Sequence, residues 1–217
     1  MSVSENIQRI KSQLPSDVTL VAVSKTQPIS SILQAYDAGQ RIFGENKIQE
    51  MADKHSQLPQ NIQWHMIGHV QTNKVKIMAP FVSLIHGVDS FKLLVEINKQ
   101  AAKNNRVIDC LLQIHIATED TKFGLDEGEL DQILNSDELP ELTNITIKGL
   151  MGMATFTDDE SVIKREFSSL KTLFDNYSAD FNFSTLSMGM SGDYKIAIDS
   201  GSNMVRIGSS IFGARNH

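Results

Sequence analysis

The lysine at position 25 is the residue whose type and place best suit covalent chemistry. It ends the run Thr19-Leu-Val-Ala-Val-Ser-Lys25, whose apolar residues are typical of a strand buried on both faces of a parallel sheet. Ligands of parallel α/β folds bind where the strands end. A lysine amine that is partly desolvated there has a lowered pKa and can attack a carbonyl carbon. Most lysines that follow strands are solvated surface groups, so the hypothesis needs support from the rest of the chain.

The elements that must position Lys25 alternate along the whole chain, as apolar runs and apolar residues at helical spacing. Strands are predicted over residues 19–25, 41–46, 62–68, 81–85, 107–116, 145–151, 185–187 and 204–208. Helices are predicted over residues 3–14, 30–39, 73–78, 125–134 and 194–198, and also around Ile48–Ala52, around Leu93–Ala101 and from Asp159 onward. Ser30, Asp159 and either Asp89 or Ser90 are the predicted helix caps.

Eight alternating units imply parallel strands joined by right-handed crossovers. The fold class we expect is α/β, a single closed (β/α)8 TIM barrel with an extra N-terminal helix. A doubly wound open sheet is the alternative. Because no linker or low-complexity segment divides the chain, we expect one domain over residues 1–217.

Composition narrows the class of protein. The chain has 217 residues, is 41% hydrophobic and 21% charged, and has a net charge of -6, which argues against nucleic-acid binding. Its one cysteine, Cys110, lies in an apolar run, where we expect packing rather than catalysis. With no possible internal disulfide, no export signal and no stretch long enough to span a membrane, the chain is predicted to be cytoplasmic, with no membrane contact.

Polar residues follow each predicted strand, where a barrel places its active groups. The stretches 187–192 and 201–213, after the last two strands, are rich in glycine and serine. Small residues let backbone N–H groups approach an anion, and these two loops of a barrel often bind phosphate, although both residue types are also common in turns. A lysine amine and a phosphate-binding loop at one mouth suit pyridoxal 5'-phosphate (PLP) held as a Schiff base.

Five motifs, spread over nearly the whole chain, carry a resemblance to a known family. They are Ala22-Val-Ser-Lys-Thr26, Phe43-Gly-Glu-Asn46, Trp64-His65 with Ile67-Gly68, Leu186-Ser-Met-Gly-Met-Ser191 and Val205-Arg-Ile-Gly-Ser209. Each motif is weak alone, but the combination resembles the pyridoxal phosphate homeostasis proteins. The resemblance implies a barrel similar to the N-terminal domain of bacterial alanine racemase. Lys47 and Phe123 depart from the family's pattern at the rim.

The resemblance also implies a set of cofactor-binding residues and no catalytic or metal-binding ones. They are Lys25 (Schiff base), Asn46 (near the cofactor), Ser191, Gly208 and Ser209 (phosphate) and Arg206 (pyridine nitrogen). A guanidinium can only donate, so Arg206 would keep the ring nitrogen unprotonated, which disfavours carbanion chemistry. From the residues alone, Arg206 could instead form an ion pair with Asp193 or Asp199 at the barrel mouth.

Two functions from different classes follow. The first is a monomeric PLP-binding protein of intracellular vitamin B6 homeostasis, which holds PLP on Lys25 and passes it to apo-enzymes by transient contact, without robust catalysis. The second is a low-activity amino-acid racemase that uses water, His65, His69 or His86 as its second base. Racemases take a catalytic tyrosine from a second domain, which we do not expect here, and the three tyrosines of this chain lie in helical patterns. A weaker third alternative is a phosphosugar enzyme in which Lys25 attacks a substrate carbonyl.

Overall fold

The computed structural model describes residues 2–118 and 123–213, in which parallel strands close into a barrel in the order β1 to β8. The strands are β1 (Thr19–Val23), β2 (Ile42–Glu45), β3 (Gln63–Met66), β4 (Val82–Val88), β5 (Ile108–Ile114), β6 (Ile145–Gly152), β7 (Thr185–Ser187) and β8 (Met204–Ile207). Each strand pairs with the next, and β8 pairs with β1. The (β/α)8 prediction is confirmed, and the open doubly wound sheet is wrong.

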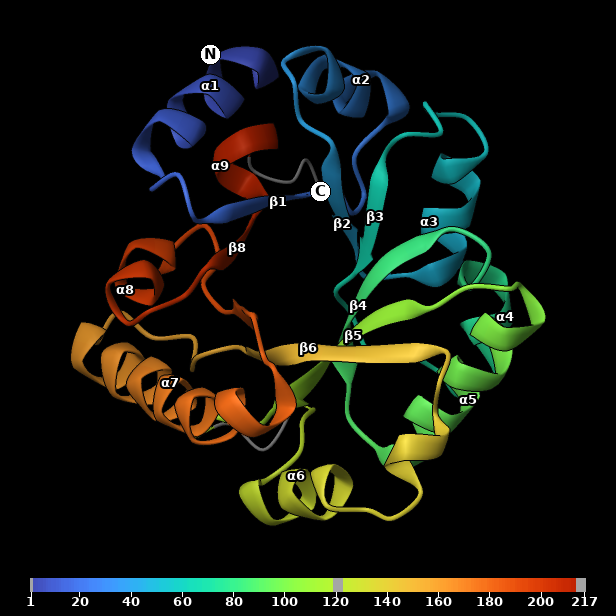
Figure 1. Ribbon diagram of the computed structural model, residues 1–217. Coiled ribbons are helices and arrows are strands. Elements are labelled where there is room, and N and C mark those ends of the chain that lie inside the picture. Colours follow the sequence, from blue (N-terminus) through green and yellow to red (C-terminus); the bar gives the residue numbers. More distant parts are fainter. Residues whose placement is uncertain (1, 119–122, 214–217) are drawn as a thin grey trace.

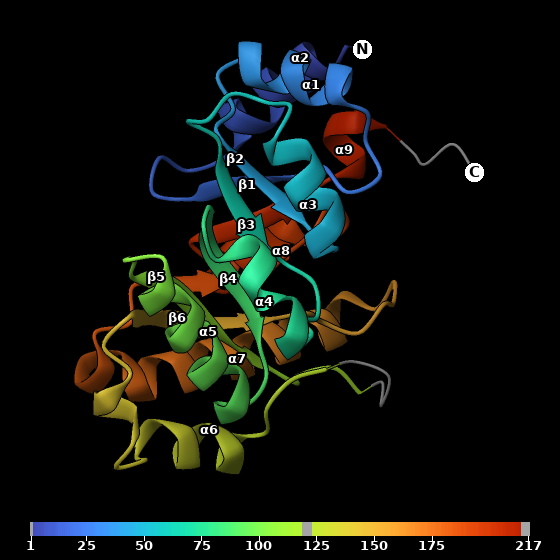
Figure 2. The ribbon, with the colours of Figure 1, turned by 90° about the vertical axis from the view of Figure 1, so that its right-hand side faces the viewer.

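The helices form a ring outside the sheet (Figure 1). They are α1 (Val3–Gln13), α2 (Ile29–Asp37), α3 (Ile48–His55), α4 (Val75–Met78), α5 (Phe91–Lys103), α6 (Glu127–Leu134), α7 (Glu160–Phe181), α8 (Tyr194–Asp199) and α9 (Ser209–Phe212), with 3-10 turns η1 (Thr72–Lys74) and η2 (Leu139–Glu141). The extra N-terminal helix α1 packs against α2 and α9. In the side view of Figure 2, α9 lies toward the right, where β8 ends.

Two hydrophobic cores result from the alternation of side chains along each strand. Leu20 and Ala22 of β1 belong to the large core between the sheet and the helices. Val21, between them, packs inside the barrel with a small cluster. The other buried members of that inner cluster are Leu84, Leu111, Met151 and Met204.

The same alternation decides which polar residues turn toward the barrel axis. Val21 faces inward, and Val23 and Lys25, two and four residues further on, have the same direction in the alternation. On β2 the partly buried Ile42 packs on the inner cluster, so Asn46, four residues further on, also has the inward direction. Ser24 and Glu45 alternate with these residues and therefore face outward, where they are fully buried beneath α3.

Several predicted boundaries move in the structure. Ser30 is not a helix cap, because α2 begins at Ile29 after Pro28 and has no side-chain cap. Ser90 and Asp159 are confirmed as the caps of α5 and α7. Helix α6 begins two residues later than predicted, because Asp126 forms a capping box there.

Two differences affect the site. Strand β4 continues to Val88, so His86 lies inside the strand rather than after it. The residues after β8 form the short helix α9, which the glycine- and serine-rich sequence did not predict.

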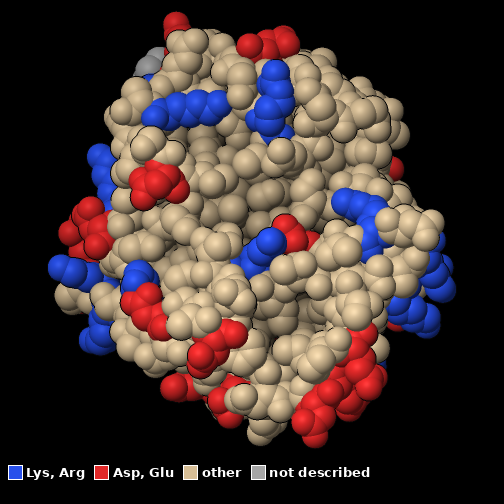
Figure 3. Space-filling view, viewed as in Figure 1, with Lys and Arg blue, Asp and Glu red and all other residues tan. Residues whose placement is uncertain are grey.

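Charged side chains are unevenly spread on the face shown in Figure 3. Acidic residues gather over α6 and the segment that follows it, while basic residues are scattered around the rim of a central hollow. Among residues 2–118 and 123–213, no helix combines the length and apolarity needed to cross a bilayer. Within the same residues, no cluster of three or more His, Cys, Asp or Glu side chains could hold a metal ion.

The packing of β6 on β7 generates a first prediction. Gly149 has φ +148°, and a Cβ there would stand 2.0 Å from the Thr185 carbonyl oxygen. We expect Gly149→Ala to lower the free energy of unfolding by about 3 kcal/mol, measured by urea denaturation. Gly192→Ala is the matched control, because a Cβ at Gly192 would meet nothing within 4 Å. Equal midpoints for the two variants would contradict the prediction.

Candidate functional site

The residues predicted to form a site follow four strands at one end of the barrel. Asn46 comes directly after β2, Lys25 lies two residues beyond the end of β1, and both are half-buried. Ser191 lies in the loop after β7, and Gly208 and Ser209 follow β8. Because all strands are parallel and the barrel is closed, their carboxyl ends meet around one mouth.

Close contacts join these strand ends. The N–H of Gly208 donates to the Ser191 hydroxyl at 3.1 Å, which ties the loops after β7 and β8 together. A Cβ at Gly208 would stand 3.3 Å from the Val23 carbonyl oxygen, so this loop also lies against the end of β1. A Cβ at Gly68 would stand 2.4 Å from the Asn46 carbonyl oxygen, so only glycine after β3 leaves space for the backbone of Asn46.

The loops after β7 and β8 present hydrogen-bond donors suited to an anion. Within residues 2–118 and 123–213, no acceptor is assigned to the backbone N–H groups of Ser191, Gly192, Ser209 and Ser210. Helix α9 has no side-chain cap, which leaves its first N–H groups available. The open space at Gly192 lets a ligand approach this backbone closely. The donor set fits a phosphate group.

Arg206 is buried inside the barrel on β8, and its three hydrogen bonds go to uncharged oxygen atoms. Nη1 donates to the carbonyl oxygen of Ser187 at 2.8 Å and to its hydroxyl at 2.6 Å, and Nη2 donates to the Gly152 carbonyl oxygen at 3.0 Å. Burial lowers the pKa of Arg206 to about 10, and the charge of Asp193 opposes this decrease. The arginine therefore stays charged at neutral pH, with Nε assigned no acceptor among the described residues.

A chain of buried polar side chains crosses the barrel beneath the mouth and ends on Arg206. His65 Nδ1 lies 3.0 Å from His86 Nε2, and His86 Nδ1 lies 3.0 Å from the Ser187 hydroxyl. Burial is the main cause that lowers the pKa of His65 to about 3 and that of His86 well below its usual value. Both rings are therefore neutral.

One proton arrangement satisfies all these contacts. In it the Ser187 hydroxyl accepts from Arg206 and donates to His86, and His86 donates to His65; the opposite tautomers, in which His65 donates to His86 and His86 to Ser187, fit the same distances. The chain thus fixes the position of Arg206 from below. Neither histidine reaches the mouth as a free base, which differs from the expectation that His86 follows its strand.

The end of β1 carries a second buried polar cluster. Lys54 of α3 lies 2.8 Å from Glu45 and 2.7 Å from Glu50, and its ammonium also donates to the Ser24 carbonyl oxygen at 2.7 Å. Ser24 in turn donates its hydroxyl to Glu45. Sequence reasoning missed this cluster, because nothing in the local pattern distinguishes a buried lysine from the solvated lysines of a surface helix.

The mouth also has an outer rim. A hollow of about 420 Å³ lies between the loops after β3 and β4, where His69 Nδ1 is 3.0 Å from Asp89. Phe123, one of the family departures, is 55% exposed and stacks on His69 at 4.3 Å. Lys47, the other departure, is exposed at the start of α3. Both departures therefore affect the rim and leave the strand ends unchanged.

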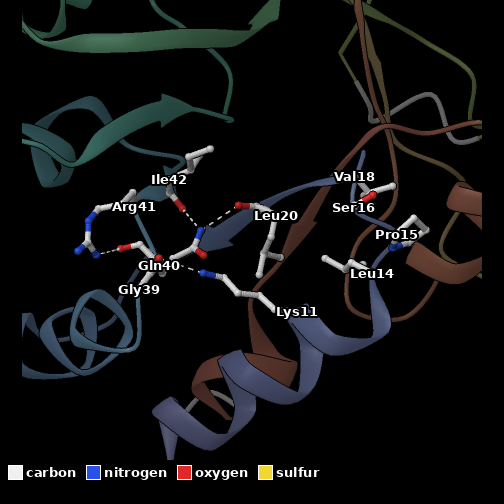
Figure 4. A pocket seen from close by; sticks show the side chains of 10 residues that line it. All are labelled: Lys11, Leu14, Pro15, Ser16, Val18, Leu20, Gly39, Gln40, Arg41 and Ile42. Carbon is white, nitrogen blue, oxygen red and sulfur yellow. Dashed lines mark hydrogen bonds between the residues drawn. The ribbon is translucent and has the colours of Figure 1, made fainter.

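A separate hollow of about 360 Å³ lies at the opposite end of the barrel, where β1 and β2 begin (Figure 4). Its polar groups are used in internal hydrogen bonds: Lys11 donates to Gly39, Gln40 to Leu20 and Ile42, and Arg41 to its own turn. This hollow lies where α1 packs beside the α2–β2 connection, at the opposite end of the barrel from the carboxyl ends of the strands.

Other reactive side chains lie away from the mouth. The hydroxyls of Tyr36, Tyr177 and Tyr194 bond to Asn61, Asp131 and Gln13. Cys110 is fully buried on β5, and burial raises the pKa of its thiol. The packing role predicted for Cys110 is confirmed by its burial.

Comparison with known proteins shows which family this chain belongs to. A family model described as alanine racemase, N-terminal domain, matches residues 2–216. The pyridoxal phosphate homeostasis protein of Vibrio alginolyticus is 38% identical, over 100% of this chain and 99% of that protein. This chain belongs to the family of pyridoxal phosphate homeostasis proteins. The member from Escherichia coli K12 is 37% identical over 94% of this chain and 88% of its own.

Solved structures include close relatives of this chain and more distant ones. PipY of Synechococcus elongatus, solved without PLP, is 32% identical with a TM-score of 0.90, over 98% of this chain and 100% of its own. The same protein with PLP bound superposes with a TM-score of 0.87. Alanine racemase of Clostridium difficile has a TM-score of 0.79 at 15% identity, which shows a shared fold, and this chain covers 57% of it.

The hydrogen-bonded series from His65 to Arg206 predicts that two serine variants differ in their effect on stability. Ser187→Ala removes a hydroxyl that serves two buried partners, so we expect the free energy of unfolding to fall by about 2 kcal/mol. Ser200→Ala is the control, because the buried Ser200 hydroxyl has no partner among the described residues. Urea denaturation measures both variants, and equal effects would refute the role given to Ser187.

The two buried histidines predict a pH dependence of stability. Their pKa values are depressed in the folded protein, whereas an unfolded histidine titrates near 6.5, so the unfolded chain binds more protons below that pH. Stability is then present near pH 7 and is lost as the pH falls, by about 2 kcal/mol between pH 7 and 5.5 for two rings.

Urea denaturation measures this loss, but the raised pKa of buried Glu45 shifts stability in the opposite direction. The NMR ring signals of His65 and His86 give the direct test. We expect them to stay unchanged from pH 7 to 5.5, and a midpoint near 6.5 in either ring would disprove the assignment.

Proposed function

We propose that this protein binds PLP at the barrel mouth, holds it as a Schiff base on Lys25, and takes part in intracellular PLP homeostasis. The observation that carries the proposal is that the end of β1, which leads to Lys25, lies against the loop after β8, because Gly208 lies against Val23. The loops after β7 and β8 present the backbone N–H groups suited to a phosphate. A lysine and an anion-binding backbone at one mouth suit an aldehyde that carries a phosphate. The relatives named for PLP homeostasis and the PLP-bound PipY support this choice of ligand.

Each site residue has a role in this proposal. The bound cofactor supplies an aldehyde that condenses with an amine, with loss of one water. Lys25 would provide the amine, while Ser191, Gly208 and Ser209 would bind the phosphate. The Gly208 N–H, which donates to the Ser191 hydroxyl in this structure, would exchange that acceptor for a phosphate oxygen. Asn46 lines the mouth beside the end of β3.

Arg206 has a distinct role. Its Nε has no assigned acceptor among the described residues, as is also true of one N–H of Nη2, and Nε would donate to the pyridine nitrogen. The buried chain from His65 keeps the guanidinium in place. Because Arg206 stays charged and only donates, that nitrogen would remain unprotonated, which disfavours carbanion chemistry.

We further propose that the protein handles the cofactor without robust catalysis. Racemisation needs a second acid–base group across the substrate, and the three tyrosine hydroxyls bond elsewhere, while His65 and His86 are buried and neutral. His69 is the exposed histidine at the rim, and it favours the second candidate function, a low-activity racemase.

The remaining parts of the proposal concern the protein in the cell. We propose one domain over residues 1–217, a monomer in the cytoplasm, and transient contact with apo-enzymes that receive PLP. A net charge of -6 speaks against nucleic acid as a partner.

Lys25→Ala tests the anchor. We expect the wild-type protein with PLP to absorb in the visible range and, after borohydride reduction, to carry a pyridoxyl group on the peptide containing Lys25. The alanine variant should lose the adduct and keep its fold by circular dichroism. Lys47→Ala, at the exposed rim, is the control. An adduct on any other lysine alone would overturn the anchor, and no adduct at all would overturn the proposal and favour the phosphosugar alternative.

A second experiment separates handling from catalysis. The loaded protein is incubated with L- and D-alanine in deuterated water, and Cα exchange is followed by NMR. We expect exchange no faster than with free PLP. Faster exchange that is lost in His69→Asn would establish the racemase instead.

A further inference from the structure

Lys25 sits in an unusual stretch of backbone. Thr26, the next residue, has φ +64°, in the left-handed region that β-branched residues rarely adopt. The other described non-glycine residues with positive φ are Asn105 and Asn182, a residue type that tolerates this conformation. Such an outlier persists only where its surroundings hold it in place.

Helix α3 supplies what holds it. The peptide group before Lys25 presents the Ser24 carbonyl oxygen, which accepts from Lys54 Nζ at 2.7 Å. The peptide group after Lys25 presents the Thr26 N–H, which donates to Glu50 Oε1 at 2.6 Å. Both peptide groups that flank Lys25 are therefore held by side chains one helical turn apart on α3.

The two side chains are also joined to each other and to the sheet. Lys54 Nζ lies 2.7 Å from the same Glu50 oxygen and 2.8 Å from Glu45 Oε1. Burial raises the pKa of Glu50, but the hydrogen bonds from Lys54 and Thr26 outweigh this, and the pKa is lower than usual. Lys54 is 6% exposed, and a buried ammonium between two carboxylates has few alternative positions.

Glu45 extends the cluster to the second strand of the site. It is fully buried at the end of β2, directly before Asn46, and accepts the Ser24 hydroxyl. One carboxylate thus joins the side chain of Ser24, directly before Lys25, to the end of β2, directly before Asn46. These side chains lie on the outward face of the sheet, whereas Lys25 and Asn46 have the inward direction of the alternation.

We propose that Glu50 and Lys54 are positioning residues, which hold Lys25 in the strained turn that aims its amine into the mouth; this rests on the proposed Schiff base. They touch the lysine's peptide groups rather than the ligand. Loss of the Glu50 carboxylate frees the Thr26 N–H and allows the turn to relax. The amine then meets an aldehyde less often in the right orientation, while the phosphate loops stay intact.

Glu50→Ala is the main variant, because Glu50 is half-buried and its loss leaves Lys54 paired with Glu45. Asp175→Ala is the control, since Lys171 and Asp175 of α7 also form an i,i+4 pair, in the reverse order, more exposed, and away from Lys25. Glu50→Gln should restore the wild-type behaviour, because its amide oxygen still accepts the Thr26 N–H. Circular dichroism melts verify that all variants fold.

The ligand comparison uses PLP and pyridoxine 5'-phosphate, which has the phosphate but no aldehyde. We expect Glu50→Ala to weaken PLP binding about tenfold or more and to leave pyridoxine 5'-phosphate binding unchanged. Asp175→Ala should change neither. Equal weakening of both ligands, or a Glu50→Ala protein that binds PLP as the control does, would overturn the proposal.

A measurement without cofactor keeps this test separate from the proposed function. Amide hydrogen exchange at Thr26, followed by NMR in the cofactor-free protein, should be slow in the wild type and in Asp175→Ala, and at least tenfold faster in Glu50→Ala. Unchanged exchange would overturn the positioning role whether or not Lys25 reacts with PLP. Fast exchange in Glu50→Ala with no adduct on wild-type Lys25 would retain the positioning role and reject the Schiff base.

Discussion

The closed sheet of parallel strands imposes the constraint on which the rest of this structure depends. Closure leaves each strand with only two directions for its side chains, toward the barrel axis or toward the helices. Lys25, Asn46 and Arg206 follow the axial direction, while Ser24 and Glu45 face α3. The mouth and its support are thereby built from neighbouring residues of the same strands.

The interior of the barrel is apolar at one level and polar at the next. Val21 and its partners fill one layer, and the chain from His65 to Arg206 crosses another. A buried guanidinium is tolerated there because its hydrogen bonds reach oxygen atoms fixed by β6 and β7. The two histidines stay neutral in the same surroundings, so the layer carries one positive charge just beneath the mouth.

The relation to alanine racemase concerns architecture. The barrel of the racemase superposes on this chain, although identity is only 15%. Homeostasis proteins share far more, with 38% identity over the full length of the Vibrio alginolyticus protein. A common barrel with largely different residues does not by itself determine a function.

The sequence by itself determined the alternation of strands and helices, the family, and the placement of Lys25 after a buried strand. These depend on local apolar spacing and on short motifs, which act over a few residues. It predicted the loops after β7 and β8 as an anion site, but it missed helix α9, whose four residues carry little periodicity.

Only the tertiary structure decided that His86 lies within β4, that Ser187 and His86 meet across 101 residues of chain, and that Lys54 is buried. The physical reason is that burial of a polar group depends on partners brought by other elements. Lys54 looks like any surface lysine of a helix until Glu45 and the end of β1 are placed against it.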